Sequence, residues 1–188
     1  MNRSNRGIVL SLAFLVATIS FALLGIGTNT QEKGNTVMPK PEMSPPAADY
    51  DHPPKKAFDR SDNFFTFDQL DEWYRSPGEY THRLDGAKYG FESLSFIITD
   101  TQPNGGPNLH VHDVEEAHVL LEGIAEYRIG EKTFTVKAPY VVKVPAGVPH
   151  TFVNTGTEPF KLVAVFASPH LASKRLGPNP LIKVIKKK

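Results

Sequence analysis

Between residues 90 and 166, apolar and polar residues alternate in short segments, which is the pattern of β-strands that bury one face. Glycine, proline and asparagine residues separate these segments as turn signals. The expected strands lie around residue 110 and at 90–98, 116–121, 125–129, 132–136, 140–144, 150–154 and 160–166. Short strands at this spacing predict an all-β sandwich or barrel, and without an internal repeat they predict one domain.

The periodicity before residue 80 is different and favours a helix. Three apolar residues from Phe67 to Tyr74 fall on one helical face. Thr66, followed three positions later by Gln69, fits a capping box, and the Pro-Gly pair at 77–78 is a typical stop signal. The sequence therefore predicts a short N-terminal helix that begins at Phe67, ends near this pair and packs on the outside of the domain.

An uncharged apolar run at residues 7–27 follows Arg3 and Arg6, which is the layout of a secretory signal or a membrane anchor. The run is long enough to span a bilayer, whereas Gly25 and Gly27 offer small residues for cleavage. Residues 1–27 are therefore interpreted as a signal peptide or a membrane anchor. Both alternatives place the remaining chain outside the cytoplasm, in the periplasm or at the cell surface.

The rest of the chain divides into a linker, a domain and a tail. Residues 28–60 are rich in proline and poor in aliphatic residues, so we expect a flexible linker. Residues 61–170 hold the predicted strands. Residues 171–188 end in lysines and form a basic C-terminal tail, whose apolar residues could cover a neighbouring strand or a second subunit. A homodimer is therefore one expected assembly.

Composition narrows the classes of partner. The 188 residues carry a formal net charge of +1, and outside the C-terminal lysines they lack the clustered positive charge of a nucleic-acid-binding surface. The chain has no cysteine, so disulfides cannot stabilise an exported domain and an ordinary hydrophobic core must do so. We expect a small-molecule ligand or substrate and no nucleic acid.

The chemistry concentrates in two segments of the predicted barrel. His110 and His112 are two positions apart, so in a strand they point to the same face, and Glu116 shares their parity. His150 follows a turn that contains Pro145. Three imidazoles and one carboxylate form a ligand set for one first-row divalent metal. Iron or manganese suits these donors best, with zinc, nickel and copper as alternatives.

The spacing of these residues resembles the two sequence motifs of the cupin superfamily. The first motif is carried by His110, His112, Glu116 and Gly123, and the second by Pro145, Gly147, His150 and Asn154. Asn104 and Pro139 stand where the family pattern has glycine, which affects turns and not ligands. The resemblance implies a single-domain cupin jelly-roll β-barrel of the type 2 kind. It also implies that the metal ligands are His110, His112, Glu116 and His150.

The resemblance implies several functions and does not choose among them. Cupins with this ligand pattern include dioxygenases, oxalate-degrading enzymes and isomerases of sugars or small acids. A small-ligand-binding module without catalysis, or a domain with a structural metal, is the alternative. His118 could support a ligand or line the pocket. No catalytic residue is assigned, because neither a lid nor a second inward-facing carboxylate is evident.

Overall fold

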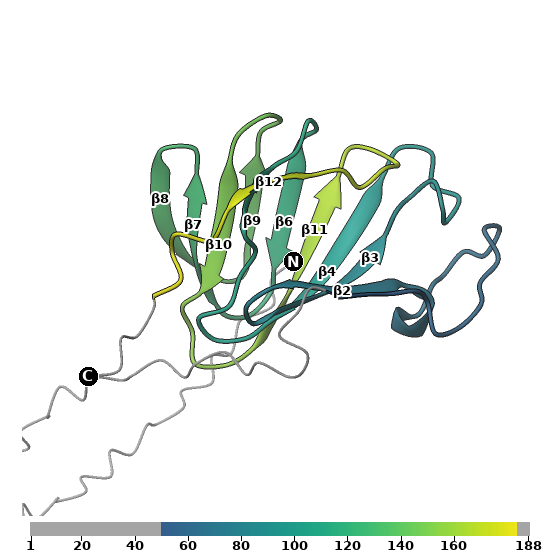
Figure 1. The fold of residues 1–188 in the computed structure, drawn as a ribbon, viewed down its shortest axis with the longest axis horizontal. Coiled ribbons are helices and arrows are strands. Elements are labelled where there is room, and N and C mark those ends of the chain that lie inside the picture. The colour runs from purple at the N-terminus through teal and green to yellow at the C-terminus, as the bar shows by residue number, and fades with distance from the viewer. Residues whose placement is uncertain (1–49, 184–188) are drawn as a thin grey trace, which may run out of the picture. The chain divides into compact units, whose positions relative to one another are not determined.

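The computed structural model describes residues 50–183, and these residues form two antiparallel sheets (Figure 1). The larger sheet has the strand order β1-β2-β3-β4-β11-β6-β9 and the smaller has the order β12-β5-β10-β7-β8. The larger sheet contains β1 (Tyr50–His52), β2 (Asp71–Ser76), β3 (Glu79–Leu84), β4 (Ser95–Thr101), β6 (Glu116–Leu120), β9 (Tyr140–Val144) and β11 (Phe160–Phe166). The smaller sheet contains β5 (Leu109–Val111), β7 (Ile124–Ile129), β8 (Lys132–Lys137), β10 (His150–Asn154) and β12 (Lys174–Gly177). The expected all-β jelly-roll is thereby confirmed.

The hydrophobic core lies between the two sheets. Leu120 on β6 and Leu162 on β11 come from the larger sheet and are fully buried, as is Tyr127 on β7 of the smaller sheet. Alternate residues of β6 and β11 are buried, which is the period expected of strands with one face toward a core. β10 is buried along its whole length because it runs through the middle of the smaller sheet.

The expected helix is wrong except for its first turn. A 3₁₀ turn, η1 (Phe67–Gln69), begins at the predicted capping box, in which the Thr66 amide donates to Oε1 of Gln69 at 2.9 Å. The chain then extends as β2, because the Pro-Gly pair is the tight turn of a hairpin and not a helix stop: Ser76 pairs with Glu79. Gly78 has φ +69, as the third residue of a type II turn requires.

The structured domain is larger than the expected 61–170 at both ends. Before residue 61, β1 pairs with β2, and Phe58 stacks on the buried ring of Tyr89. After residue 170, Leu171 packs against the core and β12 pairs with β5. The expected linker therefore ends before Tyr50, and the expected tail contributes a strand, because both segments supply apolar side chains or strand edges that the sheets use.

Other strand predictions agree with the structure apart from their ends. The hairpin of β7 and β8 turns at Gly130, whose φ of +56 fits the first position of a type II′ turn. The strand expected at 90–98 begins only at Ser95. Asn104 adopts φ +59, so it takes the left-handed conformation for which the cupin pattern uses glycine. Within residues 50–183 no helix is long and apolar enough to cross a membrane, and the apolar run at 7–27 lies outside the described residues.

Candidate metal centre

The four predicted ligands come together between the sheets. One ligand atom from each of His110, His112, Glu116 and His150 lies within 4.8 Å of the others. His110 on β5 and His150 on β10 are directly opposed in the strand register, with ring centroids 4.3 Å apart. Glu116 reaches the same point from β6 of the other sheet, with Oε2 2.9 Å from Nε2 of His150 and 3.6 Å from Nε2 of His112.

The backbone sets the tautomer of each of the three histidines. Nδ1 of His110 lies 2.7 Å from the Asn108 carbonyl, and Nδ1 of His150 lies 2.9 Å from the Val148 carbonyl. Nδ1 of His112 lies 2.6 Å from the carbonyl of Ala172. A carbonyl oxygen can only accept, so Nδ1 carries the proton in each ring. In the neutral ring the lone pair is therefore on Nε2, the nitrogen that can bind a metal.

The atoms that face one another at the centre lack hydrogen-bond partners among the described residues. Three such atoms are buried without a hydrogen-bond partner: Nε2 of His112, Nε2 of His150 and Oε2 of Glu116. Buried polar atoms normally have hydrogen-bond partners, because a buried donor or acceptor without a partner costs about 1–3 kcal/mol of stability. Lone pairs that converge on one point repel one another unless a cation lies between them. The donor set therefore fits a metal ion.

Electrostatics keep these groups in the ionisation states that a metal requires. Burial, followed by the neighbouring His150 and His112, lowers the pKa of His110 to about 3, so its ring is neutral. Burial also lowers the pKa of His112. Burial by itself would raise the pKa of Glu116, but the neighbouring His118 and His150 together outweigh it and hold that pKa well below its usual value. Neutral imidazoles at His110 and His112 and an ionised carboxylate at Glu116 are the forms that bind a metal.

The turn of the second motif, which contains Pro145 and Gly147, is hydrogen-bonded directly to the first motif. The amide of Gly147 donates to the carbonyl of His112 at 2.7 Å, and Gly147 has φ +74, which a glycine adopts without strain. Together with Pro145, this glycine directs the chain so that His150 begins β10 facing the interior. Gly123 also has positive φ, at +110, and a Cβ at this position would lie only 3.0 Å from Cδ1 of Phe160.

Asn154 closes the far end of β10 and is fully buried. Its Nδ2 donates to the carbonyls of Thr101 and Glu158 at 3.0 and 2.9 Å, and its Oδ1 accepts from the Gly156 amide at 2.9 Å. This side chain therefore connects the end of β4 with the loop between β10 and β11. Its place in the motif is structural, as expected for a residue so far along the strand from the histidines.

His118 lies behind Glu116 and not in the ligand cluster. Its Nε2 is 2.7 Å from Oε1 of Glu116, and both side chains are buried. The ionised carboxylate can only accept, so His118 donates and fixes the orientation of Glu116. Of the two roles left open for this residue, the structure supports the one in contact with a predicted ligand, although His118 also lines the cavity.

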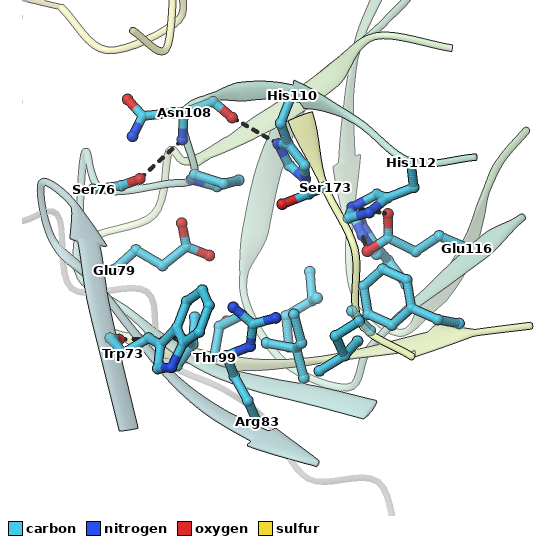
Figure 2. Close-up of a pocket in the computed structure, with 18 of the residues that line it drawn as sticks. Trp73, Ser76, Glu79, Arg83, Thr99, Asn108, His110, His112, Glu116 and Ser173 are labelled. Carbon is cyan, nitrogen blue, oxygen red and sulfur yellow. Dashed lines mark hydrogen bonds and ion pairs between the residues drawn. The ribbon is translucent and has the colours of Figure 1, made fainter. Parts of the chain in front are cut away.

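A cavity of about 490 Å³ opens beside the cluster. His110, His112 and Glu116 line one side of it, and β2 and β3 form another wall, as Figure 2 shows. Trp73 and Arg83 belong to that wall, with the guanidinium carbon 3.3 Å from the centre of the indole ring, a stacked cation–π contact. The hydrogen bonds from Asn108 to Ser76 and from His110 to Asn108 connect the two sides (Figure 2).

The sequence patterns did not predict that β3 forms a wall of the cavity. The expectation that no second carboxylate points inward is wrong. Glu79 is 5% exposed and lines the cavity. The available signal was the alternation of Glu79, Thr81 and Arg83, three polar residues on one face of a strand, all of which line the cavity. This alternation is ambiguous in the sequence, because the Pro-Gly pair before Glu79 fits the end of a helix as well as the turn of a hairpin.

Comparisons with known proteins agree with this architecture. The family model described as "Cupin domain" matches residues 97–166. A comparison with curated protein sequences finds no match. Among solved structures, oxalate decarboxylase of Lactobacillus farciminis in a formate complex is similar, with 24% identity and a TM-score of 0.55 over 60% of this chain and 35% of that one.

Oxalate decarboxylase of Bacillus subtilis is also similar, in a structure from work on the EPR parameters of its Mn(II) centres. It has 23% identity and a TM-score of 0.51 over 54% of this chain and 29% of that one. The present chain thus spans about a third of the length of these enzymes, and at this identity the similarity concerns the fold. The family match thus identifies residues 97–166 as a cupin domain, and the two-sheet fold around this segment agrees with the cupin superfamily.

Proposed function

We propose that this domain binds one divalent metal ion through Nε2 of His110, His112 and His150 and the carboxylate of Glu116. The observation that carries the proposal is the common orientation of the three rings, each held by a backbone carbonyl at Nδ1 with Nε2 directed at the same point. Three rings that are each held by a backbone carbonyl are better explained by a shared ligand than by packing, because packing does not require the same nitrogen to face inward.

We propose further that the cavity hosts a reaction on a small oxygen-rich molecule, of the dioxygenase, oxalate-degrading or isomerase type. When bound, the metal supplies a Lewis acid with coordination positions left free by the four protein ligands. A volume of about 490 Å³ suits a small ligand. The similarity of the fold to oxalate decarboxylases, including one studied for its Mn(II) centres, supports this class.

The protein residues would perform binding and orientation. Glu116, held by His118, keeps one negative charge at the centre, so a divalent ion there retains a net positive charge that attracts an anionic ligand. Arg83 and Arg175 add positive charge to the cavity wall. The apolar side chains of Phe152, Leu162 and Phe166 limit access of water on the core side.

Metal analysis of the purified 188-residue chain tests the proposal. The parent protein should contain one equivalent of metal, and the variant with His110→Ala and His112→Ala should contain almost none. His170→Ala is the matched control, since this histidine is 71% exposed and outside the cluster. Stoichiometric metal in the double variant would show that the ligand assignment is wrong.

Metal identity is tested on protein from its native host. We propose iron or manganese, because mixed imidazole and carboxylate donors suit these ions, although intrinsic affinity rises toward copper. A full complement of zinc, nickel or copper would overturn this choice.

The reaction is tested with Glu116→Gln: loss of turnover with a small change in thermal midpoint supports a catalytic metal. A large fall in midpoint, with no activity in the parent protein, supports the structural alternative.

A further inference from the structure

Glu79 is a buried carboxyl group that the ligand cluster does not use. It is the first residue of β3, and its side chain is 5% exposed. Figure 2 shows the carboxylate directed into the cavity from the side of β2 and β3, with His112 and Glu116 on the opposite side. A molecule held at the ligand cluster would therefore meet this group across the cavity.

Within residues 50–183 the side chain of Glu79 makes no hydrogen bond and no ion pair. Its neighbours on the same face of β3, Thr81 and Arg83, also line the cavity; the Thr81 hydroxyl donates to the Trp73 carbonyl, and the Arg83 guanidinium stacks on the Trp73 ring. Burying an ionised carboxylate without a partner costs several kcal/mol. A site that keeps this side chain must offset its cost either with a proton or with a partner in the cavity.

We propose that Glu79 is a ligand-binding residue of this cavity, whose carboxyl group donates a hydrogen bond to an oxygen atom of a small carboxylate bound opposite it at the ligand cluster. The inference rests on the proposed metal centre and extends it by naming the ligand class, a small carboxylate, and a residue that recognises it. A carboxylic acid that faces a carboxylate across a dry cavity forms a short, charge-assisted hydrogen bond.

The protonation that this role requires follows from the surroundings of Glu79. Burial, followed by the negative charge of Glu116, raises the pKa of Glu79 to about 8. The other charged or titratable groups that line the cavity are Arg83, His110, His112, His118 and Arg175. Burial is the larger cause and does not depend on metal occupancy, so it favours the protonated acid whether the centre is filled or empty.

The predicted consequence is affinity that depends on the proton of Glu79. Below pH 8 the acid donates its hydrogen bond, whereas above pH 8 the ionised group repels the ligand. Formate binding should therefore weaken by up to about tenfold for each pH unit above 8, since one proton is coupled to binding. The amide of Glu79→Gln keeps a donor of the same size but cannot ionise. The affinity of Glu79→Gln for formate at pH 6.5 should stay within about threefold of the parent value. The weakening of formate binding above pH 8 that is due to Glu79 should be absent in this variant.

The experiment is a calorimetric titration of formate into the 188-residue chain at pH 6.5 and 9, with Mn(II) loaded and with metal removed. The parent protein, Glu79→Gln and Glu79→Ala are compared. Glu79→Ala should bind formate about tenfold more weakly at pH 6.5, because a hydrogen bond to a charged group is lost. Infrared spectra add a readout without any ligand: the carbonyl band of a protonated carboxylic acid should be present at pH 6.5 and absent in Glu79→Gln.

Two results would overturn the inference: the same pH dependence in Glu79→Gln and in the parent protein, or no formate binding to the parent protein with or without metal. Failure of the metal proposal appears separately, as absence of Mn(II) from the parent protein. In that case the metal-free titration and the infrared band still decide the role of Glu79. If Glu79→Ala does not fold, the comparison of Glu79→Gln with the parent protein is sufficient.

Discussion

His118 holds Glu116 from behind: its Nε2 lies 2.7 Å from Oε1, while the other carboxylate oxygen, Oε2, faces the three ligand histidines. Both residues lie on the inner face of β6, two positions apart, so their relationship follows from the pleat of one strand. One oxygen of the carboxylate is thereby used for orientation and the other is directed at the centre.

Replacing His118 should weaken metal binding without removing a ligand. His118→Leu deletes the donor that orients Glu116, and loss of such a supporting contact typically costs about 10- to 100-fold in metal affinity. His118→Gln keeps an N–H at a similar distance and should recover most of the affinity. Competition with a chelator measures both variants. Equal affinities of the Leu variant and the parent protein would contradict the orienting role.

The segment after residue 170 should be required for the centre. A chain that stops after residue 170 loses β12 and the Ala172 carbonyl that holds Nδ1 of His112 at 2.6 Å. We expect metal affinity to fall by more than about tenfold, by the same loss of ligand orientation. A chain that stops after residue 183 is the control and should bind metal as the parent does. Equal metal affinity of the two truncated chains would contradict this prediction.

Asn154→Ala should destabilise the fold strongly. The buried side chain makes three hydrogen bonds to backbone groups, and its loss removes the bonds to two carbonyls and one amide. The expected loss in free energy of unfolding is about 2–4 kcal/mol, measured by urea denaturation. Lys161→Ala removes an exposed ion pair with Asp100 and should cost less than about 1 kcal/mol. Similar losses in the two variants would refute the structural assignment of Asn154.

The free energy of unfolding should depend on pH through Glu79. Its pKa is about 8 in the folded protein and is raised from 4.5, so between these values the folded state keeps a proton that the unfolded state has lost. The parent protein should therefore lose stability, relative to Glu79→Gln, as pH rises from about 4.5 to about 8. The loss is on the order of a few kcal/mol, since one pKa unit corresponds to about 1.4 kcal/mol.

Urea denaturation at several pH values measures this difference. Glu122→Gln is the control, because Glu122 is exposed and its replacement should give a curve parallel to that of the parent protein. If the free energy of unfolding of the parent protein and of Glu79→Gln changed with pH in parallel, Glu79 would have the same ionisation in the folded and unfolded states, and the prediction would be wrong.

Export remains a prediction from residues 1–27. If this segment directs the chain across the cytoplasmic membrane, protease added to intact spheroplasts should digest the domain, anchored or released. A cytoplasmic marker protein in the same cells should stay protected. Equal protection of the domain and the marker would show that the chain remains inside.

The sequence by itself determined the strands and the ligand candidates, because both depend on local periodicity. The alternation from Glu116 to Leu120 reports one buried face, and the spacing of His110 and His112 places two imidazoles on the same side of a strand. The turn at Gly147 could likewise be identified, since the need for positive φ is a property of a few consecutive residues.

Only the tertiary structure decided which residues surround the ligands, because those contacts join segments far apart in the chain. The carbonyl that fixes His112 belongs to Ala172, sixty residues later, and a carbonyl has no signature in the sequence. The hairpin that carries Glu79 resembled a helix because a Pro-Gly pair ends a helix and turns a hairpin equally well. Pairing of β3 with β4 resolved that ambiguity and placed Glu79 in the cavity, where burial changes its chemistry.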